Sequence, residues 1–109
     1  MKNEKNGNEL LQLLEALSNP YRLKIIEALR AERQYVSQLA RVLGISRPLL
    51  YLHLKKLEEA ELIKGAEERG QYGKIMKYFE VIPFRLELND RMITDAAGTV
   101  TLKNKEKGD

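Results

Sequence analysis

Gly44 separates two short stretches in which apolar residues recur at helical spacing, and no other feature constrains the fold of this chain as strongly. Before it, Ser37 is a good N-cap for a helix over residues 38–43, which Gly44 ends as a left-handed C-cap. After it, Ser46 is a good N-cap for a helix to about Ala60, with Pro48 in the first turn. Two short helices joined by a tight turn form a helix-turn-helix motif. The residues predicted to face inward are Leu39, Ala40 and Leu43 in the first helix and Leu50, Leu54 and Leu57 in the second.

Two further helices are predicted upstream of this motif. Leucines at helical spacing indicate one over residues 9–17, and Ser18, Asn19 and Pro20 end it. Asn19 is then the expected N-cap, and Pro20 the first residue, of a helix over 20–33. The pair Tyr35-Val36 is too short to be more than a connector or a single rung of a sheet. The apolar stripe of the second helix is predicted to consist of Leu23, Ile26 and Leu29, supported by Ile25 and Ala28.

After Leu62 the apolar residues no longer follow helical spacing. Residues 62–67 and 75–82 have strand character, and residues 68–74 between them form a glycine-bearing tip, so a β-hairpin is expected. Apolar and charged residues alternate over Phe84–Leu88, which predicts a half-buried strand. Residues 91–97 are compatible with a helical turn or a strand, and residues 99–102 are β-prone.

The predicted fold is therefore α+β and mainly helical: a winged helix-turn-helix with a two-stranded wing and an extra C-terminal strand-like segment. We expect one domain over residues 9–82, followed by an extension over residues 83–103 that is a candidate for dimerisation. Residues 1–8 and 104–109 are expected to be flexible tails.

Composition argues against most kinds of catalytic or metal site. The chain has no cysteine, so it has no disulfide and no thiolate metal ligand, and its one histidine cannot form a multi-histidine site. No pair of acid–base groups converges in the sequence, which predicts a protein that is not an enzyme and needs no cofactor and no metal. No apolar run approaches the roughly 18 residues of a membrane span, so a soluble, cytoplasmic protein without a membrane partner is expected.

The distribution of charge is more informative than its sum. There are 19 basic and 16 acidic residues, and a net charge of +3 is too small to identify a nucleic-acid binder. Yet residues 47–57 carry the cations Arg47, Lys55 and Lys56 without any acid, and acidic residues follow directly. This local excess of positive charge lies on the second helix of the helix-turn-helix.

Two stretches carry a resemblance to a known family: residues 16–26, ALSNPYRLKII, and residues 45–63, ISRPLLYLHLKKLEEAELI. They resemble the entry to the second helix, and the recognition helix with its step into the wing, in ArsR-type transcriptional regulators. With the hairpin the resemblance covers roughly residues 10–82. It implies a winged-helix homodimer that binds operator DNA and represses or activates transcription.

The chain departs from this family in two places. Metal-sensing members carry a cysteine pair at the start of the third helix, where this chain has Tyr35–Leu39 without a thiol, so thiolate-based sensing of arsenic, cadmium or lead is excluded. Many members dimerise through a long C-terminal helix, whereas here the strand-like Phe84–Leu88 follows the wing. The sequence offers no recognisable pocket for a small-molecule effector.

The DNA-binding candidates lie on the second helix of the motif and at the hairpin tip. Arg47 is the best base reader, because its planar guanidinium can donate two hydrogen bonds to guanine O6 and N7. For Leu49 and Leu52, packing against the second helix or the wing competes with contact to thymine methyl groups. For His53 a satisfied structural role competes with a phosphate contact, and Arg22 suits an internal ion pair as well as DNA. The full set is Ser46, Arg47, Pro48, Leu49, Tyr51, Leu52, His53, Lys55 and Lys56 on the helix, with Arg69 and Lys74 at the tip.

The candidates for a dimer interface are Leu10, Leu14, Phe84, Leu86 and Leu88, with membership of the protomer core as the alternative. The function expected from the sequence is a sequence-specific, homodimeric regulator of transcription that binds double-stranded DNA. Residues 47–60 would enter the major groove and residues 62–82 would contact the flanking backbone. The alternative is a winged-helix module that binds another protein through Leu49, Leu52 and the tail.

Overall fold

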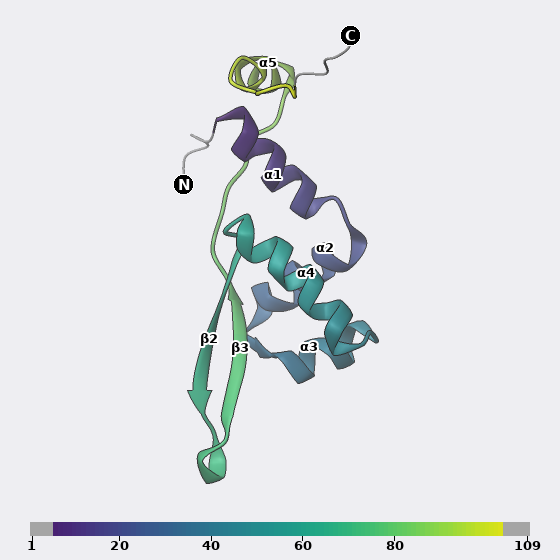
Figure 1. The fold of residues 1–109 in the computed structure, drawn as a ribbon, viewed down its shortest axis with the longest axis vertical. Coiled ribbons are helices and arrows are strands. Elements are labelled where there is room, and N and C mark those ends of the chain that lie inside the picture. The colour runs from purple at the N-terminus through teal and green to yellow at the C-terminus, as the bar shows by residue number, and fades with distance from the viewer. Residues whose placement is uncertain (1–5, 104–109) are drawn as a thin grey trace.

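The computed structural model describes residues 6–103 of the chain, and its helices form a body from which a β-hairpin projects (Figure 1). Three antiparallel strands accompany five α-helices in this part of the chain, which confirms the predicted α+β, mainly helical class. The elements are α1 (Gly7–Leu17), α2 (Pro20–Ala31), β1 (Gln34–Tyr35), α3 (Val36–Leu43), α4 (Arg47–Glu59), β2 (Ile63–Arg69), the short 3-10 turn Gln71–Gly73, β3 (Ile75–Val81) and α5 (Asp90–Ala97).

The first two helices begin at side-chain caps. In α2, Asn19 Oδ1 accepts the backbone N–H groups of Tyr21 at 2.8 Å and Arg22 at 3.3 Å, as predicted, and the helix ends two residues earlier than expected. In α1, Asn6 Oδ1 accepts the N–H of Glu9 at 2.8 Å. This cap starts α1 two residues before the predicted boundary, so Gly7 and Asn8 are helical and were wrongly assigned to the N-terminal tail. Residues 1–5 and 104–109 of the expected tails lie outside the described residues.

The start of α3 differs from the prediction. Ser37 was expected to be the N-cap, but the helix already begins at Val36 and Ser37 lies within its first turn. The reason is tertiary: Tyr35 is paired with Tyr78 in the sheet, and its backbone N–H is accepted by the Gln38 side chain at 2.8 Å. At the other end Gly44 has φ 67° and ψ 34°, which confirms the left-handed C-cap that turns the chain toward α4.

The sheet has the order β1-β3-β2 and is antiparallel throughout. The two residues of β1 pair with Phe79 and Tyr78, so Tyr35 does form a rung. The hairpin runs from the pair Ile63 and Val81 to the pair Arg69 and Ile75, which confirms the expected wing and shortens its tip to residues 70–74.

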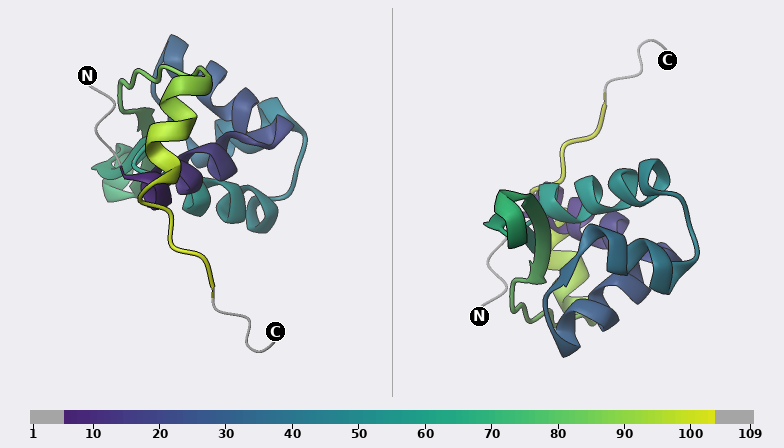
Figure 2. Two further views of the ribbon diagram at one scale, coloured as in Figure 1. Left: turned by 90° about the horizontal axis from the view of Figure 1, so that it is seen from above. Right: turned by 90° about the horizontal axis from the view of Figure 1, so that it is seen from below.

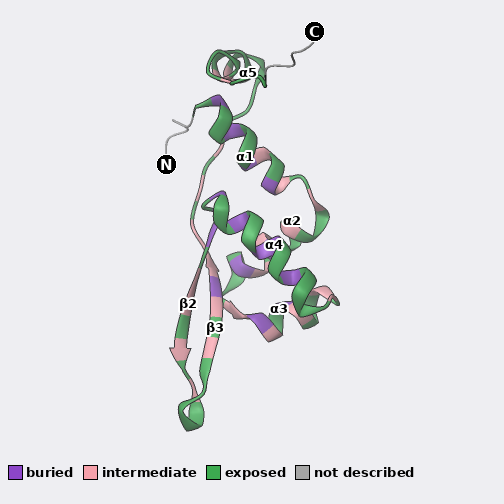
Figure 3. Ribbon diagram, in the orientation of Figure 1, coloured by how far each residue is buried: buried purple, intermediate pink, exposed green. Residues whose placement is uncertain are grey.

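The core lies where α1, α2, α3, α4 and the base of the hairpin meet (Figure 3). Leu23 was wrongly expected in it: its side chain is 54% exposed and lines a groove with Phe84, because Ile25 and Leu29 are the residues of α2 that face the core. Fully buried side chains are Phe79, Ile25, Leu39, Leu50, Leu54, Leu57, Leu62 and Ile63.

The C-terminal region lacks the predicted strand over Phe84–Leu88 and contains a helix where the sequence allowed a helical turn or a strand. Phe84–Leu88 has no ladder partner within the described residues, because the chain leaves the sheet after Val81. The alternating apolar and charged residues of this segment still differ in burial. Phe84 and Leu86 pack partly against the core, while Arg85 is exposed. Residues 90–97 form α5, which crosses the start of α1 (Figure 2), and the β-prone residues 99–102 form no strand.

Candidate nucleic-acid interface

Local signals position α4. Ser46 Oγ accepts the backbone N–H of Leu49 at 3.3 Å, and Pro48 occupies the first turn, where its missing N–H costs nothing. Leu50, Leu54 and Leu57 are buried. Because this stripe anchors one side of α4, the opposite side faces solvent along most of its length.

The structure places most of the predicted DNA-binding residues of α4 on that exposed side. Leu52 is 64% exposed and Leu49 is 40% exposed, so neither is packed into the body in the way the structural alternative required. Tyr51 is also exposed, at 45%. The exposed members of the predicted set are Ser46, Arg47, Pro48, Leu49, Tyr51, Leu52, Lys55 and Lys56.

His53 is separated from this set by its burial. Its side chain is 8% exposed, stacks on Tyr21 with ring centroids 5.5 Å apart, and has Nδ1 3.0 Å from a guanidinium nitrogen of Arg22. Burial and the neighbouring guanidinium both lower the pKa of His53 below its ordinary value of 6.5. The geometry is that of a neutral, structural histidine.

Arg22 joins three helices. Its Nε donates to the carbonyl oxygen of Ala16 at 2.7 Å and a terminal nitrogen donates to that of Glu15 at 3.4 Å, so it caps the end of α1. The same guanidinium contacts His53 in α4. Its role within the protomer is thus capping of carbonyls, and not the internal ion pair that was considered.

The wing carries two cations at its tip. Arg69 is exposed and donates from its guanidinium to the carbonyl oxygen of Gly73 at 3.3 Å, so its charge lies over the turn. Lys74 is exposed as well. Between them lies Tyr72, which is fully exposed and is not among the residues predicted from the sequence to bind DNA.

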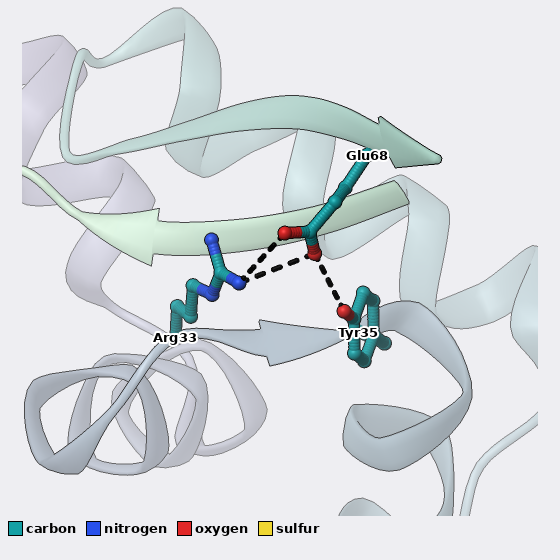
Figure 4. Close-up of polar contacts among 3 residues, drawn as sticks. All are labelled: Arg33, Tyr35 and Glu68. Atoms are coloured by element: carbon teal, nitrogen blue, oxygen red, sulfur yellow. Dashed lines mark hydrogen bonds and ion pairs between the residues drawn. The ribbon is translucent and has the colours of Figure 1, made fainter. Parts of the chain in front are cut away.

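A polar cluster fastens the wing to β1 and was missed by the sequence analysis (Figure 4). Glu68 of β2 accepts the Tyr35 hydroxyl at 2.6 Å and a guanidinium nitrogen of Arg33 at 3.1 Å. Arg33 also lies over the ring of Tyr78, 4.1 Å from its centroid. The Tyr35 hydroxyl first, and then Arg33, lower the pKa of Glu68. No local signal could reveal this cluster, because more than thirty residues separate Glu68 from its partners.

The predicted dimer residues have different environments. Leu10 is buried in the core of the protomer, Leu14, Phe84 and Leu86 pack partly against it, and Leu88 is half exposed. Between α1 and α5 lies an apolar groove of about 520 Å³, beside which Leu11, Ile93 and Leu102 remain exposed. The groove is lined by Gly7, Leu10, Leu11, Leu14, Ile93, Ala96, Ala97, Val100 and Leu102.

Over residues 6–103, no three histidine or acidic side chains lie close enough together to hold a metal ion. Within the same residues, no helix has both the length and the apolar character that crossing a membrane requires.

A helix-turn-helix whose second helix has an exposed basic face, followed by a β-hairpin, defines the winged helix-turn-helix class. Residues 17–66 match a family described as a helix-turn-helix domain. An uncharacterised HTH-type transcriptional regulator of Methanocaldococcus jannaschii is 43% identical over 57 residues, which are 52% of this chain and 60% of that protein. The chain thus spans less than two thirds of the length of this relative.

Solved structures share the fold. HlyU from Vibrio cholerae is 28% identical, with a TM-score of 0.60 over 72% of this chain and 79% of HlyU. A homodimeric winged helix-turn-helix DNA-binding domain from Mycobacterium bovis, described as a possible ArsR-family transcriptional regulator, is 19% identical, with a TM-score of 0.58 over 74% of this chain and 75% of that one. The chain therefore shares the fold of these winged helix-turn-helix proteins and resembles regulators of the ArsR type, as the sequence predicted.

Proposed function

We propose that the protein is a cytoplasmic, sequence-specific DNA-binding regulator of transcription that acts as a homodimer and not as an enzyme. Residues 47–60 enter the major groove, and the wing over residues 62–82 contacts the flanking backbone. The observation that carries the proposal is the exposed face of α4, which has cations and no acid from Arg47 to Lys56, opposite a fully buried stripe of leucines.

The order of residues along α4 fits this orientation. A recognition helix presents its N-terminal residues to base edges, and Arg47 is the first residue of α4. Tyr51, Lys55 and Lys56 follow along the exposed surface, where they can bind phosphates or base edges. The acidic Glu58 and Glu59 lie at the C-terminal end, which is expected to point away from the groove.

The groove between α1 and α5 supports the homodimer. Leu11, Ile93 and Leu102 lie exposed around an apolar surface, and a second copy of the chain would remove these side chains from water. Of the residues proposed from the sequence, Leu10 and Leu14 line this groove. Two protomers joined here would present two recognition helices to half-sites about one helical turn, roughly 34 Å, apart.

The DNA proposal is tested by selecting binding sites from a library of random duplexes, followed by fluorescence-anisotropy titration. We expect one sequence to be enriched and to bind about a thousandfold more tightly than a scrambled duplex. The preference should persist between about 50 and 200 mM salt, since base contacts are less salt-dependent than phosphate contacts. Failure to enrich any sequence would refute sequence-specific binding.

Three alanine variants assign the contacts. Arg47→Ala should cost about 1–3 kcal/mol on the selected duplex and relax the preference at one base pair. Lys74→Ala should weaken all duplexes alike, because a phosphate contact is independent of sequence. Arg91→Ala is the matched control, since Arg91 is an exposed arginine on α5 that lies outside the proposed DNA-binding surface and does not line the groove between α1 and α5.

The dimer is tested by light scattering at micromolar concentration. Leu11→Asp should give a monomer, because it places a charge in the apolar groove. Leu23→Asp is the matched control, because Leu23 is 54% exposed and Leu11 is 52% exposed, but Leu23 lies outside the groove. A wild-type monomer would refute the homodimer.

The exposed Leu49 and Leu52 favour a second candidate function, a module that binds another protein through α4. This alternative predicts weak, salt-sensitive DNA binding without sequence preference. The same selection therefore separates the two functions.

A further inference from the structure

A second groove, here called the α2 groove, lies between α2 and the segment in which the chain leaves β3. Its volume is about 730 Å³, which falls within the roughly 300–1,000 Å³ of small-molecule sites. Leu23, Ile26 and Arg30 line it from α2, where they recur at helical spacing, and Val81 and Phe84 line it from the other segment. Among the described residues, none of α4 and none that lines the groove between α1 and α5 lines this one.

The apolar residues of the α2 groove are incompletely buried. The side chain of Leu23 is 54% exposed, whereas Ile25 beside it on α2 is fully buried in the core. Ile26, Val81 and Phe84 are half-buried and pack against the core from one side only. A ligand with an apolar body would remove this surface from water, which is favourable in proportion to the area covered.

Arg30 adds a positive charge without an acidic partner to this lining. Within the described part of the chain its guanidinium makes no ion pair and no hydrogen bond, whereas that of Arg33 is held by Glu68. Among the described residues that line the groove, the one acid is Glu27, and the Lys24 ammonium 3.2 Å away offsets its charge. The helix dipole favours a cation in the last turn of α2, but this role leaves the guanidinium donors free.

The free guanidinium and the apolar surface together indicate the chemistry of a ligand. A guanidinium presents N–H donors in a planar fork that matches the two oxygens of a carboxylate. The apolar side chains beside it offer no hydrogen bonds, so they suit an alkyl or aromatic body. An acid that has such a body satisfies both parts of the lining at once.

We propose that the α2 groove binds a small carboxylic acid with an apolar body. The carboxylate accepts hydrogen bonds from Arg30, and the apolar body lies along Leu23, Ile26 and Phe84. The inference goes beyond the proposed DNA-binding function and does not depend on it, because within the described residues the site shares no side chain with α4. It gives the protein a ligand site that the sequence did not reveal.

The test is a titration of the wild-type protein with octanoate, 1-octanol and octylammonium, followed by the NMR signals of its methyl groups. The three probes share one alkyl chain and differ in the charge of the head group. We expect octanoate to bind about tenfold more tightly than octylammonium, and to shift the methyl signals of Leu23, Ile26 and Val81. Equal affinity for the two ions, or shifts confined to the groove between α1 and α5, would overturn the inference.

Arg30→Gln separates the charge of the site from its apolar surface. Arg30 is exposed, so the variant should keep its melting temperature, bind octanoate about tenfold more weakly and bind 1-octanol as before. Arg91→Gln is the matched control, because it loses the same charge from an exposed arginine that lines neither groove. Leu23→Ser should weaken octanoate and 1-octanol alike, since both use the apolar lining. The same octanoate affinity in Arg30→Gln and Arg91→Gln would overturn the inference.

A second copy of the chain is the alternative occupant of the α2 groove. The inference expects Leu23→Asp to leave the dimer intact in light scattering. A wild-type dimer that Leu23→Asp converts to a monomer would assign the groove to the interface between protomers and overturn the inference. Failure to select any DNA site would refute sequence-specific regulation and leave octanoate binding unchanged, so the two failures are distinguishable.

Discussion

The guanidinium of Arg22 in α2 lies 3.0 Å from Nδ1 of His53 in α4. Arginine is always protonated and can only donate, so Nδ1 must accept and His53 must be neutral, with its proton on Nε2. A second proton on the ring would set two positive groups against each other where little water reaches. The contact therefore depends on pH and ties the position of the candidate recognition helix to the protonation of one residue.

We expect the stability of the protein to fall as the pH drops from neutral to values below 6.5, the ordinary pKa of histidine. The pKa of His53 is lower in the folded protein than its ordinary value of 6.5, so the unfolded chain takes up the proton first. The contribution of neutral His53 to the free energy of unfolding is complete above about pH 6.5, and it is lost as the pH falls through the lowered pKa of the folded protein. The measurement is the melting temperature across this range.

His53→Gln is the control for this prediction. Glutamine can still accept a hydrogen bond from Arg22, but it does not titrate. The variant should have a flatter dependence of melting temperature on pH over the same range, whatever its stability at neutral pH. The same slope in both proteins would show that other groups are responsible.

Glu68→Gln should loosen the wing without unfolding the body. The substitution removes the charge that holds Arg33 and leaves one acceptor oxygen, in place of two, for the Tyr35 hydroxyl and the Arg33 guanidinium. Hydrogen exchange should accelerate at the backbone amides of β1 and the adjoining part of β3. Glu67→Gln is the matched control, because Glu67 precedes Glu68 in β2 and its carboxylate is exposed and lies outside the cluster. Equal exchange in the two variants would contradict a fastening role.

The same cluster should respond to acid. Its contacts lower the pKa of Glu68 below 4.5, so the cluster persists above that value and is lost as the pH falls through the folded pKa. This range lies below that of His53, so the two effects are separable in one titration.

Gly7→Ala should displace α5 from α1. A Cβ at this position would overlap the carbonyl oxygen of Ala96 and the side chain of Val100. We expect a loss of about 1–3 kcal/mol in the free energy of unfolding, although alanine is the better helix former. Gly98→Ala is the control, since a Cβ there would meet its nearest atom at 3.4 Å. Chemical denaturation of both variants tests the prediction, and equal stabilities would contradict it.

Leu54→Ala should lower the stability of the protein and Leu52→Ala should change its binding, although both residues lie on α4. Leu54 is 1% exposed, so its truncation leaves a cavity and should cost about 2–5 kcal/mol of stability. Leu52 is 64% exposed, so its truncation should leave stability within about 0.5 kcal/mol and affect only binding. Denaturant titrations give the first comparison and anisotropy gives the second. A destabilised Leu52→Ala would place that side chain in the core.

At two places the pairing of strands in the sheet determined a local structure that differs from the one predicted by the sequence pattern. The alternation over Phe84–Leu88 predicts a strand, but a strand needs a partner with free backbone groups, and the chain leaves the sheet at Val81. Ser37 has the right chemistry for a cap, yet Tyr35, which pairs with Tyr78 in the sheet, is the N-cap and the helix starts two residues earlier than predicted. The absence of backbone hydrogen bonds to a distant segment decided the first outcome, and their presence decided the second.

The sequence by itself determined the α2 and α4 starts, the turn at Gly44, the buried leucines of α4 and the hairpin, because caps, turns and periodicity act over a few residues. The exposed side of α4 follows from the same periodicity. Only the tertiary structure decided that His53 is buried against Arg22, that Glu68 joins the wing to β1, and that α5 lies on Gly7. These contacts join residues that lie far apart along the chain, and whether such groups meet depends on how the whole core packs.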